Sequence, residues 1–103
     1  VCQETFAPIV SIVSYETLDD AIRLVNESEL GLNAGIFTNV LPDALYAADE
    51  LQAGAVIIND IPTFRVDNMP YGGIKMSGYG REGIKWAIEE MTDMKFITMK
   101  KTF

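Results

Sequence analysis

The sequence contains no histidine and a single cysteine, Cys2, among its 103 residues. A disulfide needs a second cysteine, a zinc site needs a cluster of cysteines and histidines, and a Ser-His or Cys-His pair needs an imidazole. We therefore expect neither a metal site nor a catalytic pair within the chain. A reactive thiol needs a nearby base or cation, which the neighbours Val1, Gln3 and Glu4 do not supply. Cys2 is therefore predicted to have no catalytic role.

Basic side chains are also scarce, because 8 lysines and arginines stand against 15 aspartates and glutamates, for a formal net charge of −7. Binding to nucleic acid or to anionic lipid needs a basic surface, which this composition does not favour. No run of residues approaches the ~18 apolar positions of a membrane span, and no charged-then-apolar signal opens the chain. We expect a cytoplasmic protein with neither nucleic acid nor a membrane as a partner.

The remaining composition is typical of a globular domain, with 49% hydrophobic and 22% charged residues. A chain of this length forms at most one domain, and folding hides only ~65% of the surface that the unfolded chain exposes. The first residue is valine rather than methionine. We therefore expect the chain to work as part of something longer.

Strand and helix patterns alternate from the beginning of the chain. An apolar run rich in β-branched residues predicts a strand over 6–15. Thr17 can cap a helix whose first turn carries Asp19 and Asp20, which favour the positive end of the helix dipole. Apolar positions then repeat at helical spacing, and the helix should end near Asn26.

The same alternation continues with a short strand at 34–38 and a second helix that has Pro42 in its first turn. Gly54 is the expected C-cap of this helix, because glycine enters the left-handed backbone region without steric cost. A buried strand is expected over 55–59. The order strand-helix-strand-helix-strand predicts an α/β fold.

A long loop at 60–77 interrupts this order, since it contains prolines and glycines and no apolar period. A loop of more than ~15 residues is uncommon in a compact domain unless it is functional. A third helix is expected over about 82–91, and a short strand at 95–100 closes the chain. That strand has no neighbour close in sequence, so we expect it to pair with another sheet, such as one in a second subunit.

Arg65 is the chemically informative residue of the long loop. Its guanidinium could grip a carboxylate, phosphate or phosphonate of a substrate through two hydrogen bonds. The alternative, which spacing alone favours, is a surface ion pair with Asp60 or Asp67. Phe64 and Tyr71 could line an apolar pocket or simply fix the loop.

Residues 78–83 have the spacing Gly-x-Gly-x-x-Gly, which is typical of dinucleotide binding. That pattern binds a pyrophosphate only between a buried strand and a helix, and here a loop precedes it. We interpret the glycines as a tight turn that leads into the third helix.

Four motifs in order resemble those of the aldehyde dehydrogenase superfamily. They are ETFAP at 4–8, GLNAGIFT at 31–38, AGAVIIN at 53–59 and PYGGIKMSGYGREG at 70–83. The resemblance implies that residues 1–92 are the C-terminal part of the family's catalytic domain, with the substrate-funnel loop at 60–77. It implies that 93–103 contain the oligomerisation strand, so that Lys95 to Lys100 would join a homo-dimer or homo-tetramer.

The resemblance also implies the chemistry. Members of the family oxidise an aldehyde to an acid or acyl product with NAD or NADP, and the cofactor carries the redox step. A cysteine thiolate attacks the aldehyde, a hydride passes to the nicotinamide, and the thioester is hydrolysed. The family's catalytic cysteine, general-base glutamate and nucleotide-binding domain lie upstream of such a segment. The 103 residues alone are therefore expected to be inactive.

Matched positions carry over the family's binding roles. Glu4 corresponds to the glutamate that hydrogen-bonds the nicotinamide ribose, and Phe6 to the aromatic residue beside the nicotinamide ring. Ala7 stands where the family usually has glycine, and its added methyl group could displace Phe6.

The loop from Phe64 to Tyr71 corresponds to a wall of the substrate funnel. It looks most like the loop of members that act on small or acid-bearing aldehydes, such as lactaldehyde, glyceraldehyde-3-phosphate and phosphonoacetaldehyde. The resemblance therefore implies that Phe64, Arg65 and Tyr71 bind the substrate, with Arg65 on an anionic group.

Two other classes of protein stay open at this point. One is a stand-alone dimerisation or interaction module that keeps the fold without the catalysis. The other is a small regulatory α/β domain that binds a ligand with the long loop. An upstream coding region with a catalytic cysteine would separate the dehydrogenase from both.

Overall fold

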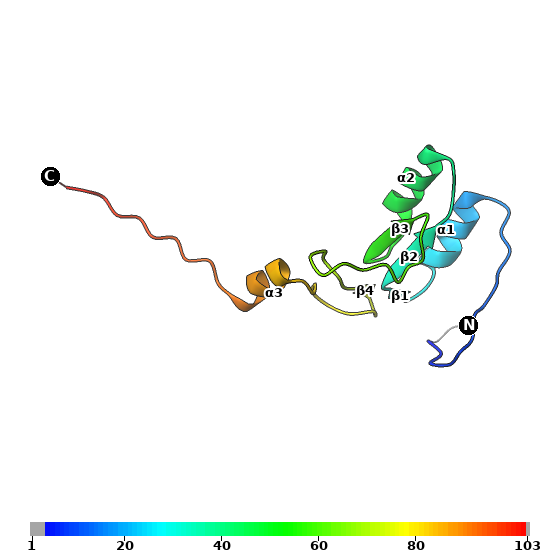
Figure 1. Cartoon of the computed structure of the whole chain (residues 1–103), viewed down its shortest axis with the longest axis horizontal. Coiled ribbons are helices and arrows are strands. Elements are labelled where there is room, and N and C mark those ends of the chain that lie inside the picture. Colours follow the sequence, from blue (N-terminus) through cyan, green and yellow to red (C-terminus); the bar gives the residue numbers. More distant parts are fainter. Residues whose placement is uncertain (1–3, 103) are drawn as a thin grey trace.

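The structure is a computed structural model that describes residues 4–102. In chain order, the elements are α1 (Leu18–Asn26), β1 (Leu30–Gly31), β2 (Asn33–Ile36), α2 (Leu41–Glu50), β3 (Ala55–Ile58), β4 (Ile74–Lys75) and α3 (Ile84–Met91). The helices α1 and α2 and the four strands gather in one unit, from which α3 and the C-terminal tail run out to one side (Figure 1). The mixture of helices and strands confirms the predicted α/β class.

The start of α1 is fixed by the cap that the sequence predicts. The Thr17 hydroxyl oxygen accepts a hydrogen bond from the backbone N–H of Asp20 at 3.2 Å, and Asp19 and Asp20 lie in the first turn. Both features stabilise a helix N-terminus, whose first N–H groups lack partners within the helix. The helix ends at Asn26, as predicted.

The helix α2 begins as predicted, with Pro42 in its first turn, but its predicted C-cap is wrong. The chain leaves the helix at Leu51, which is extended and donates its N–H to the carbonyl of Ala47. Gly54 lies beyond this point, and its backbone is not left-handed. Glycine is required there for another reason, because a Cβ at position 54 would overlap the carbonyl oxygen of Gly72.

Two small sheets complete the central unit. The strands β2 and β3 are parallel, in a register that pairs Asn33 with Ala55 and Ile36 with Ile58, and α2 is the connection between them. The strands β1 and β4 are antiparallel and pair Leu30 with Lys75. The short strand β4 was not predicted, since two residues within a loop rich in glycine carry no periodic signal.

The two central helices pack together and supply the buried apolar side chains of the unit. These are Ile22 of α1 and Ala44 and Ala47 of α2. The Tyr46 hydroxyl of α2 donates a hydrogen bond to the Asp19 carboxylate of α1 at 2.9 Å. This bond and the nearby negative charge raise the pKa of Tyr46 above its ordinary value.

Both predicted terminal strands are absent from the described part of the chain. Residues 4–17 contain no strand, and neither do residues 92–102. A strand requires hydrogen bonds to a neighbouring strand, and a β-branched run without such a neighbour does not form one. The apolar side chains of these segments are exposed; among them Phe6 is 93% and Phe96 89% exposed.

The predicted third helix is confirmed as α3, yet none of its residues is buried. The molecule measures 74 × 34 × 23 Å with a radius of gyration of 19.2 Å. A compact domain of this length has a radius of gyration of about 13 Å. The accessible surface of 8958 Å² exceeds the roughly 5,800 Å² of a folded monomer of this mass. Folding alone thus leaves the apolar residues at both ends of the chain uncovered.

Candidate functional site

The long loop leaves the central unit at the carboxyl end of β3, through Asn59. This residue has a φ of 59°, which is unusual for a residue with a side chain. Its N–H donates to the carbonyl of Ile36 at 2.7 Å, and its side-chain oxygen accepts from the N–H of Thr38 at 2.8 Å. The carboxyl ends of parallel strands are where α/β proteins bind their ligands.

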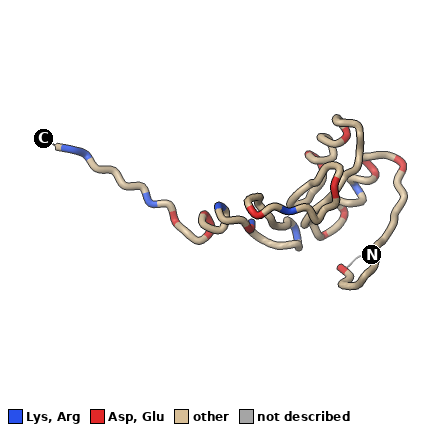
Figure 2. Tube along the Cα trace, viewed as in Figure 1, with Lys and Arg blue, Asp and Glu red and all other residues tan. Residues whose placement is uncertain are grey.

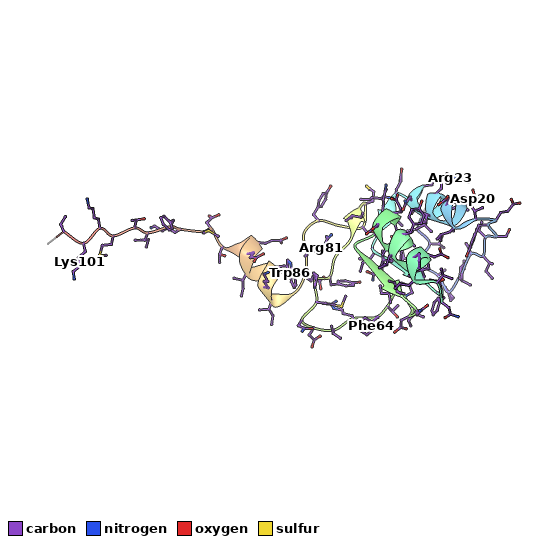
Figure 3. All side chains as sticks on the ribbon, turned by 90° about the horizontal axis from the view of Figure 1, so that it is seen from above. Asp20, Arg23, Phe64, Arg81, Trp86 and Lys101 are labelled. Carbon is purple, nitrogen blue, oxygen red and sulfur yellow. The ribbon has the colours of Figure 1, made fainter. Side chains whose placement is uncertain are left out.

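The first residues of the loop lie against β2. The Asn33 side chain donates a hydrogen bond to the carbonyl of Pro62 at 2.9 Å. A Cβ at Gly35 would lie 3.1 Å from the carbonyl oxygen of Asp60, so the loop approaches the strand closely. These contacts fix the direction in which the loop continues toward Phe64, which is 49% exposed and labelled in Figure 3.

Arg65, Tyr71 and Glu82 come together further along, and we call them the Arg65 cluster. The Nη2 atom of Arg65 lies 3.0 Å from Oε2 of Glu82, and its Cζ atom lies 4.3 Å from the centroid of the Tyr71 ring. Tyr71 and Glu82 are joined by two backbone hydrogen bonds, of 3.1 and 2.6 Å. The predicted ion pair of Arg65 with Asp60 or Asp67 is wrong, because Arg65 pairs with Glu82.

The geometry of the cluster leaves Arg65 able to bind an anion. A guanidinium has five N–H donors in a planar fork, and its contact with an aromatic face orients that plane. Within the described residues, Glu82 is the partner of one terminal nitrogen, and the other N–H groups of Arg65 have no hydrogen bond. The Arg65 side chain is 46% exposed, so an incoming anion can reach those groups.

The glycine-rich segment at 78–83 forms the turn that the sequence predicts before α3. Gly80 and Gly83 have φ values of 72° and 115°, and Gly83 is the N-cap of α3. The Arg81 guanidinium donates to the carbonyls of Gly73 and Gly80 at 3.0 and 2.8 Å, and so fixes the turn (Figure 3). The hydrogen bonds of the Arg81 guanidinium therefore go to backbone carbonyls of the turn and of the loop before it.

The structure does not bring all of the predicted site residues together. Glu4 and Phe6 lie on the exposed N-terminal segment, and no hydrogen bond, ion pair or ring contact joins them to the Arg65 cluster within the described residues. Cys2 lies outside the described residues. Glu82 was missed by sequence reasoning, because it is 17 positions from Arg65 and nothing local signals their contact.

Acidic side chains are the possible metal ligands within residues 4–102, because this range contains neither histidine nor cysteine. No group of three or more histidine, cysteine, aspartate or glutamate residues in this range could hold a metal ion. No helix in the same range is long and apolar enough to cross a membrane. Acidic residues lie on α1 and α2, α1 also carries Arg23, and lysines follow in the tail (Figure 2).

A sequence profile described as the aldehyde dehydrogenase family matches residues 1–97. The chain therefore belongs to the aldehyde dehydrogenase family, which confirms the resemblance of its four motifs. It is 52% identical over 100 residues to a 3-sulfolactaldehyde dehydrogenase of Priestia aryabhattai, covering 96% of this chain and 21% of that protein. It is 52% identical over 94 residues to a lactaldehyde dehydrogenase of Methanococcus aeolicus, covering 91% of this chain and 20% of the relative. The chain spans about a fifth of the length of these relatives.

Solved structures agree with this family. A salicylaldehyde dehydrogenase of Pseudomonas putida G7, solved with salicylaldehyde, matches 98% of this chain and 22% of its own, with a TM-score of 0.86 and 32% identity. A glyceraldehyde-3-phosphate dehydrogenase of Methanocaldococcus jannaschii, solved with NADP, matches 75% of this chain and 17% of its own. The TM-score is 0.72 and the sequence identity is 49%. A betaine aldehyde dehydrogenase of Staphylococcus aureus, solved with NAD⁺, matches 85% of this chain and 17% of its own. The TM-score is 0.80 and the sequence identity is 39%.

Proposed function

We propose that the chain is the C-terminal part of an NAD(P)-dependent aldehyde dehydrogenase that oxidises a small, anionic aldehyde to its acid. The observation that carries this proposal is the Arg65 cluster, in which a guanidinium over an aromatic ring keeps N–H donors available. Two similar proteins are named for aldehydes with a sulfonate or a phosphate group. A planar guanidinium suits either group, because it can donate two parallel hydrogen bonds.

Each residue of the loop then has a role in binding. Arg65 holds the anionic end of the aldehyde, and Tyr71 orients the guanidinium by packing beneath it. Phe64 supplies an apolar wall for the carbon chain, since its ring is half exposed on the same loop. These contacts position the aldehyde for the reaction and select the substrate without taking part in the bond changes.

Bound NAD or NADP would supply the hydride acceptor for the oxidation. The N-terminal segment offers two side chains that fit its nicotinamide riboside end. The carboxylate of Glu4 is exposed and has no hydrogen bond to another described residue, so it can accept hydrogen bonds from two ribose hydroxyls. The Phe6 ring is 93% exposed, which leaves its face available for packing against a flat ring.

The catalytic thiol and general base are proposed to lie outside this chain, so the 103 residues alone would have no dehydrogenase activity. Residues 1–92 would complete the catalytic domain, with the substrate loop at 60–77. Residues 93–103 would join subunits through Lys95 to Lys100, in a homo-dimer or homo-tetramer. We place the enzyme in the cytoplasm.

The substitution Arg65→Leu in the full-length enzyme tests the proposal. It should raise KM for an anionic aldehyde about tenfold or more, because a hydrogen bond to a charged group contributes ~1.5–3 kcal/mol. KM for a neutral aldehyde of similar size should stay within about twofold, since no charge is then lost from the contact. Steady-state kinetics on both substrates measure the difference.

The matched control is Arg23→Leu, because Arg23 is an exposed arginine on α1 that pairs with Glu27. It should change neither KM. An equal rise of KM for both aldehydes in Arg65→Leu would contradict the binding of an anion by Arg65.

A further inference from the structure

We propose that Glu82 limits how strongly the substrate loop favours an aldehyde with two negative charges over one with a single negative charge. This inference rests on the proposed function, in which Arg65 holds the anionic end of the aldehyde. Glu82 would then be a residue that determines specificity through its charge.

The contacts of Glu82 place its carboxylate at one end of the guanidinium. Its Oε2 atom lies 3.0 Å from Nη2 of Arg65. Its backbone is held beside Tyr71 by the hydrogen bonds in both directions, and Tyr71 carries the ring that lies under the guanidinium. Carboxylate, ring and cation are therefore fixed relative to one another by the backbone and by the ion pair.

The pair has no net charge, which changes what the remaining N–H groups can bind. An anion on the free edge of Arg65 is attracted by the guanidinium and repelled by the Glu82 carboxylate a few ångströms further away. The Glu82 side chain is 66% exposed, so water weakens this repulsion without abolishing it. The repulsion grows in proportion to the charge of the substrate.

A carboxylate or sulfonate carries one negative charge, whereas a phosphate monoester carries nearly two at neutral pH. The attraction to Arg65 and the repulsion from Glu82 both double for the phosphate, so Glu82 offsets part of the advantage that the second charge would have at an unpaired guanidinium. Glu82 therefore narrows the difference in binding between the two kinds of anion.

The test is Glu82→Gln in the full-length enzyme, because glutamine keeps the size and a hydrogen-bonding oxygen but removes the charge. Three aldehydes of similar size are compared: one neutral, one with a carboxylate and one with a phosphate. One charge about 6 Å away in water changes binding about threefold, and the effect is about tenfold for two charges. KM should fall by these factors for the carboxylate and the phosphate, and stay unchanged for the neutral aldehyde.

The matched control is Glu89→Gln, since Glu89 is a glutamate on α3 with a similar exposure of 62%, paired with Lys85 at 4.0 Å. It should leave all three KM values unchanged. The ratio of KM values between substrates is the readout, because a uniform loss of activity does not alter it. If Glu82→Gln does not fold, Glu82→Met of similar length replaces it, and thermal melting shows which variant is folded.

The outcomes separate this inference from the function on which it rests. If Arg65→Leu discriminates against anionic aldehydes but Glu82→Gln shifts all three KM values equally, the role of Glu82 is overturned while the proposed function stands. If Arg65→Leu itself shows no preference, the anion contact is overturned and the role of Glu82 falls with it. In the double variant, the charge preference seen in Glu82→Gln should disappear.

Discussion

Asn26 joins three elements through one side chain and one carbonyl. Its side-chain nitrogen donates to the carbonyl of Glu50 at 2.8 Å, and its side-chain oxygen accepts from the N–H of Gln52 at 2.8 Å. Its own carbonyl accepts from the Lys75 ammonium at 2.8 Å. The end of α1 is thereby tied to the end of α2 and to β4, and the asparagine amide uses both of its functions.

The substitution Asn26→Ala should lower the free energy of unfolding by about 1–3 kcal/mol, because it removes two hydrogen bonds and leaves their backbone partners unpaired. Thermal melting of the full-length enzyme measures the loss. Asn68→Ala is the control, since Asn68 forms no hydrogen bond with another described residue. Equal melting temperatures for the two variants would show that Asn26 does not hold these elements together.

Residue types alone left the role of Arg65 open between an anion contact and a surface ion pair. They did predict the Thr17 cap, because its partner is three residues away. The partner of Arg65 could not be predicted in the same manner. Glu82 reaches it because the chain turns back and pairs with Tyr71, and that pairing depends on packing over a long sequence separation.

The elements show the same division between local and distant causes. The helices α1, α2 and α3 and the strands β2 and β3 were predicted, since helical spacing and short apolar runs are local signals. The strand β4 and the true role of Gly54 were not, because both depend on segments that meet only in the folded chain. The strand predicted at 6–15 failed for the corresponding reason, that its run of residues has no neighbouring strand.

The contact between the start of β3 and the substrate loop allows a prediction for Gly54. A Cβ at this position would overlap the Gly72 carbonyl and would lie 2.9 Å from the oxygen of Leu32. Gly54→Ala should therefore force the loop away from β3 and destabilise the enzyme by about 1–3 kcal/mol. Thermal melting and KM for the aldehyde should both change. A variant with unaltered melting would contradict the close approach.

At the scale of the whole molecule, exposed apolar surface extends to both ends. In the tail, Ile97 is 74% and Met99 90% exposed, and the tail is drawn as the long extension in Figure 1. Side chains of this kind are normally covered, and a segment without a partner strand can form one by adding to the edge of another sheet. The tail has the composition and the exposure that the proposed subunit contact requires.

The substitution Ile97→Pro tests this contact in the full-length enzyme, because proline removes a backbone donor that strand pairing uses. It should shift the enzyme toward monomers in sedimentation velocity at low protein concentration. Ile97→Thr is the control, since threonine keeps the N–H and the branched Cβ. An oligomer that is equally stable in both variants would exclude backbone pairing at this position.

One part of the substrate loop lies between two attachments, the Asn33–Pro62 hydrogen bond and the Tyr71–Glu82 bridge. Residues 63–70 between these attachments form backbone hydrogen bonds only to residues of the same loop, within the described chain. If this segment binds the aldehyde as proposed, substitutions there would change which aldehyde is accepted while the rest of the fold stays the same. New substrate preferences would then evolve in this segment with little loss of stability, and an engineer would randomise the same positions as one cassette.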